Sequence, residues 1–359
     1  MGASKTVVVG MSGGVDSSVS ALLLKQQGYQ VIGLFMKNWE EQDENGICTS
    51  ATDYDDVRKV CEVIDIPYYS VNFVKEYRQQ VFDQFIEDFK RGLTPNPDIL
   101  CNREIKFKAF LDKAMALGAN FLATGHYCQN EKIGGQHGQH ALVKGADKQK
   151  DQTYFLYTIG SSVLEKVLFP IGGLEKSEVR RIAREHHLPT SEKKDSTGIC
   201  FIGERHFRTF LSQHLAMQPG SFETLDGKRV GSHQGAAYYT LGQRKGLGIG
   251  GAGEAWFVVS KDINRGVVFV EQGADHPALY RSQLVAAELS WVSGATPQCP
   301  FVCRSKIRYR QEDQPCVIAK IENGQAWVDF PVPQRAITPG QSIVFYEGSI
   351  CLGGGVIQP

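Results

Sequence analysis

The 359-residue sequence has no excess of charge of either sign, because 39 lysines and arginines balance 39 aspartates and glutamates. Overall electrostatic attraction therefore does not drive binding to nucleic acid, although a local basic surface is compatible with this balance. Long apolar runs are also missing, and the longest fall far short of the roughly 20 residues that cross a bilayer as a helix. The sequence therefore predicts no membrane segment.

Cysteine patterns typical of metal sites are absent as well. The nine cysteines include no C-x-x-C pair, and the closest two, Cys299 and Cys303, have no matching pair or nearby histidine. We expect no bound structural metal and mostly reduced, buried thiols. No secretory signal precedes the first predicted strand at Thr6, and the loop after that strand lies too near Met1 for a transit peptide. We expect a cytoplasmic protein.

Two common phosphate-binding motifs are missing too, since there is neither a Gly-Lys-Ser/Thr loop nor a G-x-G-x-x-G fingerprint. Instead, the β-branched run 6–9 predicts a strand, and apolar residues from Val19 onward recur at helical spacing until Gly28. Between them stand Gly10, Met11, Ser12, Gly13, Gly14, Val15, Asp16 and Ser17. Glycines allow close backbone approach, and N–H groups at a helix start point at an anion. This glycine loop (residues 10–17) therefore predicts a nucleotide phosphate site.

The first part of the chain alternates strands with helices. Further strands are predicted at residues 31–36, 68–71 and 121–124. Such alternation favours a doubly wound parallel sheet, in which ligands bind at the carboxyl ends of strands. Gly10, Met36 and Gly125 all lie at such ends, so we expect them to converge on one nucleotide.

The remainder divides into two regions. Residues 150–215 read as helices with loops, including an amphipathic helix over 177–188 that Pro189 stops. From Pro219 onward, short alternating runs are punctuated by the hairpin turns Asp226-Gly227 and Asn323-Gly324. This region is predicted to be all β, with a small sheet followed by a barrel.

Several separated strings occur in an order that resembles one enzyme family. They are residues 10–18, Asn96-Pro97-Asp98 with Cys101, residues 123–127, residues 150–155, residues 195–202, residues 239–244 and residues 307–310. Together they resemble the tRNA-specific 2-thiouridylase family over essentially the whole chain, and the glycine loop resembles the PP-loop of ATP pyrophosphatases. The resemblance implies an α/β fold with a doubly wound parallel-sheet PP-loop domain (1–215, its part from about 150 contacting tRNA), a small central β domain (216–280) and a C-terminal β-barrel (281–359).

The implied activity replaces the C2 oxygen of the wobble uridine of tRNA by sulfur. ATP, with Mg²⁺, adenylates that oxygen and releases pyrophosphate, and AMP leaves when sulfur arrives. The resemblance makes Cys200 the persulfide carrier and Cys101 its catalytic partner, while Asp98 orients or deprotonates the base. The outer sulfur of Cys200 either attacks the activated carbon directly, or Cys101 attacks Cys200 to release sulfide and leave a disulfide. The implied partners are tRNA and a persulfide-carrying donor, either a relay protein or a cysteine desulfurase.

The resemblance also implies a set of RNA contacts. These are Asn96, Pro97 and Asp98 at the target base, and Lys150, Asp151, Gln152, Arg308, Tyr309 and Gln341 elsewhere on the tRNA. Without the family, Asp151 reads as the N-cap of a solvated helix. The alternating Arg304, Lys306, Arg308 and Arg310 would share one face of a strand and form a positive row, with Tyr309 on the other face. His126 is expected to be a hydrogen-bonded structural histidine.

Two alternatives belong to other functional classes. A PP-loop amidotransferase would join nitrogen to an adenylated carbonyl, but no glutaminase half is recognisable. A non-catalytic nucleotide- and RNA-binding protein would not need the intact Ser12, Asp16 and Ser17 of the glycine loop.

Overall fold

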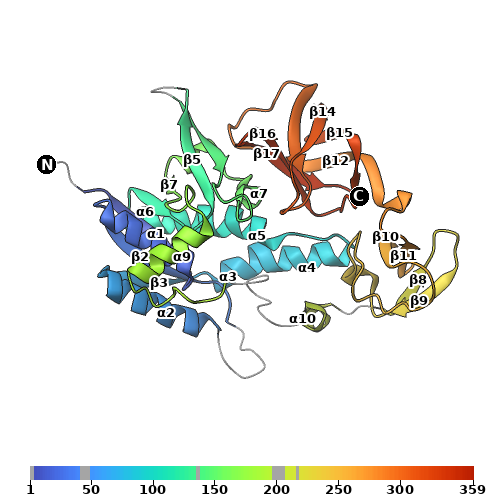
Figure 1. The fold of residues 1–359 in the computed structure, drawn as a ribbon, viewed down its shortest axis with the longest axis horizontal. Coiled ribbons are helices and arrows are strands. Elements are labelled where there is room, and N and C mark those ends of the chain that lie inside the picture. Colours follow the sequence, from blue (N-terminus) through green and yellow to red (C-terminus); the bar gives the residue numbers. More distant parts are fainter. Residues whose placement is uncertain (1–3, 41–48, 135–137, 196–206, 216–217) are drawn as a thin grey trace.

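The computed structural model describes residues 4–40, 49–134, 138–195, 207–215 and 218–359 (Figure 1). Three parts follow one another in the ribbon: an α/β domain in blue to green, a small sheet in yellow, and a barrel in orange to red. Within the described residues, no helix is long and apolar enough to span a bilayer.

The N-terminal sheet is parallel, with strand order β3-β2-β1-β4-β7. Its strands are β1 (Thr6–Met11), β2 (Gln30–Lys37), β3 (Tyr68–Asn72), β4 (Phe121–Ala123) and β7 (Val167–Leu168). Successive side chains of β1 point to opposite faces, so Val8 belongs to one apolar core while Val7 and Val9 belong to another. The predicted doubly wound sheet is confirmed.

Helices cover both faces of this sheet. One face carries α1 (Val15–Gln26), α2 (Thr49–Ile64) and α9 (Lys176–Glu185). The other face carries α3 (Val74–Tyr77), α4 (Asp83–Lys90) and α6 (Phe110–Ala116), together with π-helical turns at Arg78–Phe82 and Cys101–Ala109. Gly28 follows α1 with φ +86°, which confirms its predicted role in ending that helix.

The region 150–215 contains short helices, as predicted. They are α7 (Thr153–Leu156), α8 (Ser161–Leu164), α9 and α10 (Phe207–His214). The predicted amphipathic helix is α9: Val179 and Ala183 are buried, whereas Arg181 and Arg184 are exposed. Phe210 of α10 packs into the core of the N-terminal domain.

One hairpin was not anticipated from the sequence. Strands β5 (Cys128–Ile133) and β6 (Gln139–Lys144) pair with each other, and β6 also pairs with β17 of the C-terminal barrel, placing Leu142 opposite Cys351. The hairpin therefore ties the N-terminal domain to the barrel by backbone hydrogen bonds.

The C-terminal barrel closes on itself. Its strands are β12 (Tyr280–Trp291), β13 (Phe301–Lys306), β14 (Gln314–Glu322), β15 (Gln325–Arg335), β16 (Ser342–Glu347) and β17 (Ile350–Ile357), and β12 pairs with both β15 and β17. Asn323 and Gly324, at φ +49° and +74°, form the predicted turn between β14 and β15.

The central part is a four-stranded sheet with its own core. Strands β8 (Gly220–Glu223), β9 (Arg229–His233), β10 (Trp256–Asp262) and β11 (Val267–Gln272) follow the order β10-β11-β8-β9. Phe222, Val258 and Val268 are fully buried in it. The predicted turn at Asp226-Gly227 lies between β8 and β9, with Gly227 at φ +89°.

Candidate active site

The glycine loop is held in a tight path from β1 into α1. Gly13 has φ +74°, and a Cβ atom there would lie 2.7 Å from the carbonyl oxygen of Asp53. After β4, a Cβ atom on Gly125 would lie 2.8 Å from the backbone nitrogen of Ser17. Only glycine fits at these two positions, because α2 packs against the loop at Gly13 and the chain after β4 packs against the start of α1 at Gly125.

Hydroxyl groups fix the shape of this loop. Ser17 Oγ accepts a hydrogen bond from the Ser12 backbone N–H at 3.2 Å and donates to Gly14 O at 3.1 Å. Ser18 Oγ donates to Gly14 O at 2.8 Å. Helix α1 begins after Gly14, which offers no side-chain acceptor to the first backbone N–H groups. Such a helix start is suited to an anion.

Gly10, Met36 and Gly125 lie at or just beyond the carboxyl ends of β1, β2 and β4, which are neighbours in the sheet. These three strand ends therefore lie side by side, while their convergence on one nucleotide stays a prediction. Met36 is half-buried against the apolar core, and its contact with the nucleotide stays a prediction.

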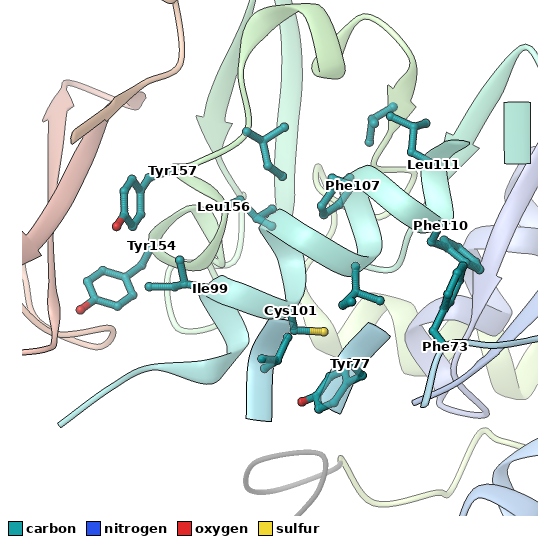
Figure 2. Packing of buried hydrophobic residues seen from close by; sticks show 14 of the residues in the cluster. Phe73, Tyr77, Ile99, Cys101, Phe107, Phe110, Leu111, Tyr154, Leu156 and Tyr157 are labelled. Carbon is teal, nitrogen blue, oxygen red and sulfur yellow. The ribbon is translucent and has the colours of Figure 1, made fainter. Parts of the chain in front are cut away.

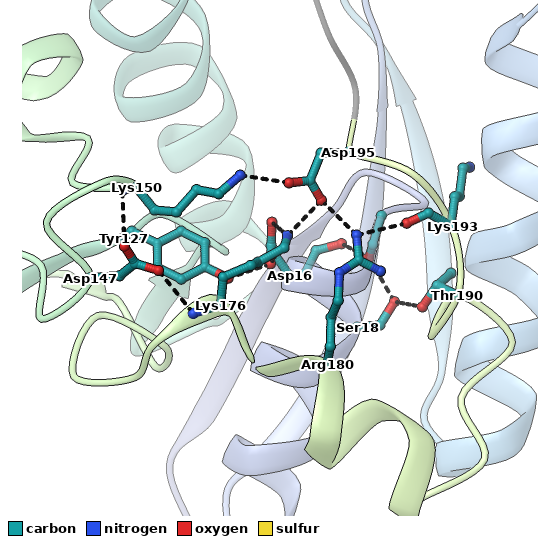
Figure 3. Close-up of polar contacts among 12 residues, drawn as sticks. Asp16, Ser18, Tyr127, Asp147, Lys150, Lys176, Arg180, Thr190, Lys193 and Asp195 are labelled. Atoms are coloured by element: carbon teal, nitrogen blue, oxygen red, sulfur yellow. Dashed lines mark hydrogen bonds and ion pairs between the residues drawn. The ribbon is translucent and has the colours of Figure 1, made fainter. Parts of the chain in front are cut away.

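A charged cluster faces the start of α1 (Figure 3). Lys176 Nζ, from α9, lies 2.8 and 2.9 Å from the two carboxylate oxygens of Asp16, and the Tyr127 hydroxyl donates to Asp16 at 2.7 Å. Asp195 contacts three cations, with its oxygens 2.7 Å from Lys150 Nζ, 2.8 Å from Lys176 Nζ and 3.0 Å from an Arg180 nitrogen. The loop that should receive a phosphate therefore already borders several cations.

The acidity of this cluster reflects those contacts. Partial burial alone would raise the pKa of Asp195, but hydrogen bonds and attraction from Lys150 and Lys176 lower it to about 2. Burial, together with the neighbouring Asp16 carboxylate, raises the pKa of the Tyr127 hydroxyl far above its usual range. Asp195 is therefore ionised, and Tyr127 remains a hydrogen-bond donor at neutral pH.

Residues 96–101 begin the helical segment that runs from α5 (Pro97–Leu100) into the π-helical turn at Cys101–Ala109. Asn96 Oδ1 accepts the backbone N–H of Asp98 at 3.1 Å, and Pro97 occupies the first position of α5. Burial raises the pKa of the Asp98 carboxyl, although Lys106 opposes the shift. A half-buried carboxylate with raised proton affinity suits the predicted exchange of a proton with a base.

Cys101 follows Asp98 by one helical turn. Its side chain is 2% exposed and lies in the apolar cluster near the helix that carries Tyr77 (Figure 2). It is therefore in a packed helix, although the sequence Pro95-Asn96-Pro97 shortly before it is typical of a loop. Cys200, its predicted partner, lies outside the described residues, so the distance between the two sulfurs stays a prediction.

In the 150–152 stretch, the side chains of Asp151 and Gln152 accept hydrogen bonds from other parts of the chain. Asp151 is 5% exposed and accepts hydrogen bonds from the Thr153 hydroxyl at 3.0 Å and the Gly145 N–H at 3.2 Å. Gln152 Oε1 accepts the Tyr127 backbone N–H at 2.9 Å. The predicted solvated setting of Asp151 is wrong, because the carboxylate is buried, but Asp151 Oδ1 does accept the backbone N–H of Thr153, the first residue of α7, at 3.3 Å. Contact of this stretch with RNA stays a prediction.

The predicted positive row on one strand is also wrong. β13 ends at Lys306, which is buried with its Nζ 3.6 Å from Asp151, and the chain then turns as Gln311 Oε1 accepts the Ile307 N–H at 2.8 Å. Of the four cations, Arg304 and Arg310 are the exposed ones. Alternation in the sequence continues past the turn, but the strand does not.

Arg308 and Gln341 instead join domains. One guanidinium nitrogen of Arg308 donates to Leu241 O at 3.0 Å, Ala336 O at 3.1 Å and Thr338 Oγ1 at 3.2 Å, linking the central part to the barrel. Gln341 Nε2 donates to the carbonyl of Thr94 at 2.7 Å, and the Thr94 N–H donates to the carbonyl of Pro339 at 2.9 Å. The barrel thus holds the chain two residues before Asn96.

Tyr309 packs its ring on Phe155, with 4.4 Å between ring centroids, and its hydroxyl donates to Lys150 O at 3.4 Å. His126 is buried, its Nδ1 lies 2.8 Å from the Thr124 hydroxyl, and burial lowers its pKa well below the usual value. The prediction of a structural histidine is confirmed. RNA contacts at Arg308, Tyr309 and Gln341 stay predictions.

Sequence reasoning missed Lys176, Arg180 and Tyr127 as neighbours of the glycine loop. The available signal was the spacing of Arg180, within the helix predicted over 177–188, and Lys176, which directly precedes that helix and lies four residues before Arg180. The contact of Lys176 with Asp16, 160 positions earlier, is a tertiary contact that no local pattern contains.

Family models match nearly the whole chain. Residues 5–204 match the family described as tRNA methyl transferase HUP domain, residues 208–272 its PRC-barrel domain, and residues 281–357 the aminomethyltransferase beta-barrel domain. The chain is 73% identical over 99% of its length to the tRNA-specific 2-thiouridylase MnmA of Protochlamydia amoebophila, covering 93% of that protein. It is 57% identical to the protein of the same name from Shouchella clausii, covering 98% of this chain and 96% of that one. With that from Nitrosomonas eutropha it shares 58% identity, covering 98% of both chains. This chain belongs to the tRNA-specific 2-thiouridylase family.

Proposed function

We propose that this enzyme replaces the C2 oxygen of the wobble uridine of tRNA by sulfur, consuming ATP and releasing AMP and pyrophosphate. Family membership along nearly the full chain, at 73% identity to one relative, carries the proposal. The glycine loop at the start of α1 supports it, because this geometry suits the phosphates of a nucleotide.

The first step in this proposal is adenylation. The uridine O2 attacks the α-phosphorus of ATP, the bond to the β-phosphate breaks, and pyrophosphate leaves. Asp98, whose raised pKa follows from burial, accepts or shares the base proton as O2 becomes nucleophilic. Asn96 and Pro97 fix the start of the helix that carries Asp98 and so orient it toward the target base.

The second step moves sulfur, and two routes remain open. In one, the outer persulfide sulfur of Cys200 attacks C2 and AMP leaves; Cys101 then attacks the inner sulfur, which frees the thiocarbonyl and forms a Cys101–Cys200 disulfide. In the other, Cys101 attacks Cys200 first, which releases sulfide for the attack on C2 and leaves the same disulfide. Either disulfide must be reduced before the next cycle.

Mg²⁺ is the expected companion of ATP. Among the described residues, no group of three histidines, cysteines or carboxylates is arranged to hold a metal without ATP. Asp16 is the carboxylate of the glycine loop and would share the ion with ATP oxygens, which fits the preference of Mg²⁺ for one or two carboxylates plus phosphates. Bound there, the ion would neutralise charge on the leaving pyrophosphate.

The proposed partners follow from this chemistry. tRNA would contact residues 96–98 at the base and residues near Lys150, Gln152, Arg308, Tyr309 and Gln341 elsewhere. Since Arg308 and Gln341 hold domains together, RNA would meet the junction that they form. A persulfide-carrying relay protein or a cysteine desulfurase would supply sulfur, and the cytoplasm is the expected location.

The experiment incubates the purified full chain with unmodified tRNA, ATP and a sulfide source, and measures 2-thiouridine by mass spectrometry together with AMP and pyrophosphate. A transcript with cytidine at the wobble position is the control. We expect 2-thiouridine and AMP in equal amounts with the uridine transcript alone. A product bearing nitrogen would favour the amidotransferase, and tRNA binding without AMP would favour the non-catalytic protein.

A further inference from the structure

Lys176 is a half-buried cation that the mechanism above does not use. Its side chain is 12% exposed, and its ammonium lies within 2.9 Å of both Asp16 and Asp195 (Figure 3). The ring of Tyr127 lies 5.7 Å from the same nitrogen. Helix α9 thus places one lysine against the first turn of α1, beside the glycine loop.

This position has an electrostatic consequence for any phosphate in the loop. Asp16 belongs to the first turn of α1, where its negative charge opposes an incoming anion. Lys176 is the cation in contact with Asp16 and offsets that charge. The three N–H donors of the ammonium face three carboxylate oxygens, two of Asp16 and one of Asp195, so a phosphate oxygen would take the place of one of these contacts.

The neighbouring Arg180 differs from Lys176 in its hydrogen-bond partners. Arg180 donates to the backbone carbonyls of Ser191 and Lys193 as well as to Asp195, which fixes it to the chain. The contacts of Lys176 Nζ are with ionised side chains, which a phosphate can replace without leaving a backbone group unpaired. A lysine on a flexible stem can also move between such partners more readily than an arginine.

We propose that Lys176 is a phosphate ligand that binds the pyrophosphate portion of ATP, exchanging its contact with Asp16 or Asp195 for a phosphate oxygen. Asp195, held by Arg180 and Lys150, keeps the ammonium aimed at the loop. As the bond between the α- and β-phosphates breaks, negative charge grows on the β-phosphate, and Lys176 stabilises it. This inference rests on the proposed ATP-dependent function and adds the residue that recognises the leaving group.

The competing explanation is that Lys176 is only a counter-ion that keeps Asp16 and the loop in shape. A counter-ion would affect every ligand of the loop alike, whereas a pyrophosphate ligand affects only ligands that carry the β-phosphate. Binding of inorganic pyrophosphate and of AMP to the same variant therefore separates the two roles.

The test measures both affinities by titration calorimetry on the full chain, for wild type, Lys176→Ala and Lys176→Arg. Arg181→Ala is the matched control: it removes a cation from the same helix, but Arg181 is exposed and pairs with Glu178 and Glu185. We expect Lys176→Ala to weaken pyrophosphate binding by about tenfold or more, the usual worth of a hydrogen bond to a charged group. AMP binding should be unchanged, Lys176→Arg should lie in between, and Arg181→Ala should match wild type.

Pyrophosphate affinity equal to wild type in Lys176→Ala overturns the inference, as does an equal loss for AMP and pyrophosphate. Circular dichroism checks folding, and Lys176→Gln, which keeps most of the side-chain stem, replaces the alanine variant if that one does not fold. A wild-type chain that binds neither ATP nor pyrophosphate contradicts the proposed function itself, which distinguishes the two failures.

Discussion

Removing the guanidinium of Arg308 should destabilise the junction between the central sheet and the barrel. Its Nη2 donates to Leu241 O, Ala336 O and Thr338 Oγ1, and Ala336 and Thr338 are almost fully buried. Loss of a charged hydrogen bond costs about 1.5–3 kcal/mol, and the carbonyl of the half-buried Leu241, which loses this donor, adds about 1 kcal/mol, whereas the Ala336 carbonyl keeps the Thr338 hydroxyl as its donor. We therefore expect Arg308→Ala to lower the free energy of unfolding by about 2–4 kcal/mol.

Urea unfolding followed by tryptophan fluorescence is a suitable assay, since Trp256 lies in the central sheet and Trp291 and Trp327 lie in the barrel. Arg310→Ala is the control, because Arg310 is exposed and close in sequence; its effect should stay within about 0.5 kcal/mol. Equal stability of the Arg308 and Arg310 variants would refute the reasoning that Arg308 joins the two parts.

Four further variants test the chemistry. Asp16→Ala should abolish AMP formation while the circular dichroism spectrum is retained, because Asp16 lies in the glycine loop; wild-type rates of AMP release would contradict this role. Cys200→Ser should fail to acquire radiolabelled persulfide sulfur, whereas Cys101→Ser should load the label but not pass it to tRNA, since only the carrier accepts sulfur; the reverse pattern would exchange the two assignments. Burial raises the pKa of Asp98 in the folded chain above its value of 3.8 in an unfolded chain. The free energy of unfolding therefore falls as the pH rises from the unfolded pKa through the folded pKa, because the buried carboxyl becomes charged. In urea unfolding, Asp98→Asn should therefore be more stable than wild type at pH 7 but not at pH 3. The variant should also lose thiolation. If the variant and wild type were equally stable at both pH values, burial of the carboxylate would have no such cost.

Local patterns predicted the parts of the fold that local forces determine. The β-branched run before the glycine loop, the apolar spacing of α1 and α9, and the turn at Asn323-Gly324 all depend on residues close in sequence, and each is confirmed. The loop itself could be predicted because Gly13 needs a positive φ that its residue type permits.

Long-range contacts account for what the sequence did not reveal. The mostly polar strand β5 reads as a loop, and its hairpin is stabilised in part by β17, more than 200 positions later. The burial of Lys306 depends on Asp151, and the environment of Asp16 depends on Lys176 in a distant helix. For the same reason, sequence spacing identified neither the domain junction at Arg308 nor the cations around the glycine loop.

One isotope measurement tests the central claim of the proposed reaction most directly. A tRNA anticodon stem-loop carrying ¹⁸O at C2 of the wobble uridine is incubated with the full chain, ATP and a sulfide source, and both AMP and the nucleoside are analysed by mass spectrometry. Adenylation of O2 predicts one ¹⁸O atom in AMP for every 2-thiouridine formed. Thiolation with unlabelled AMP, or labelled water in place of labelled AMP, would contradict the account.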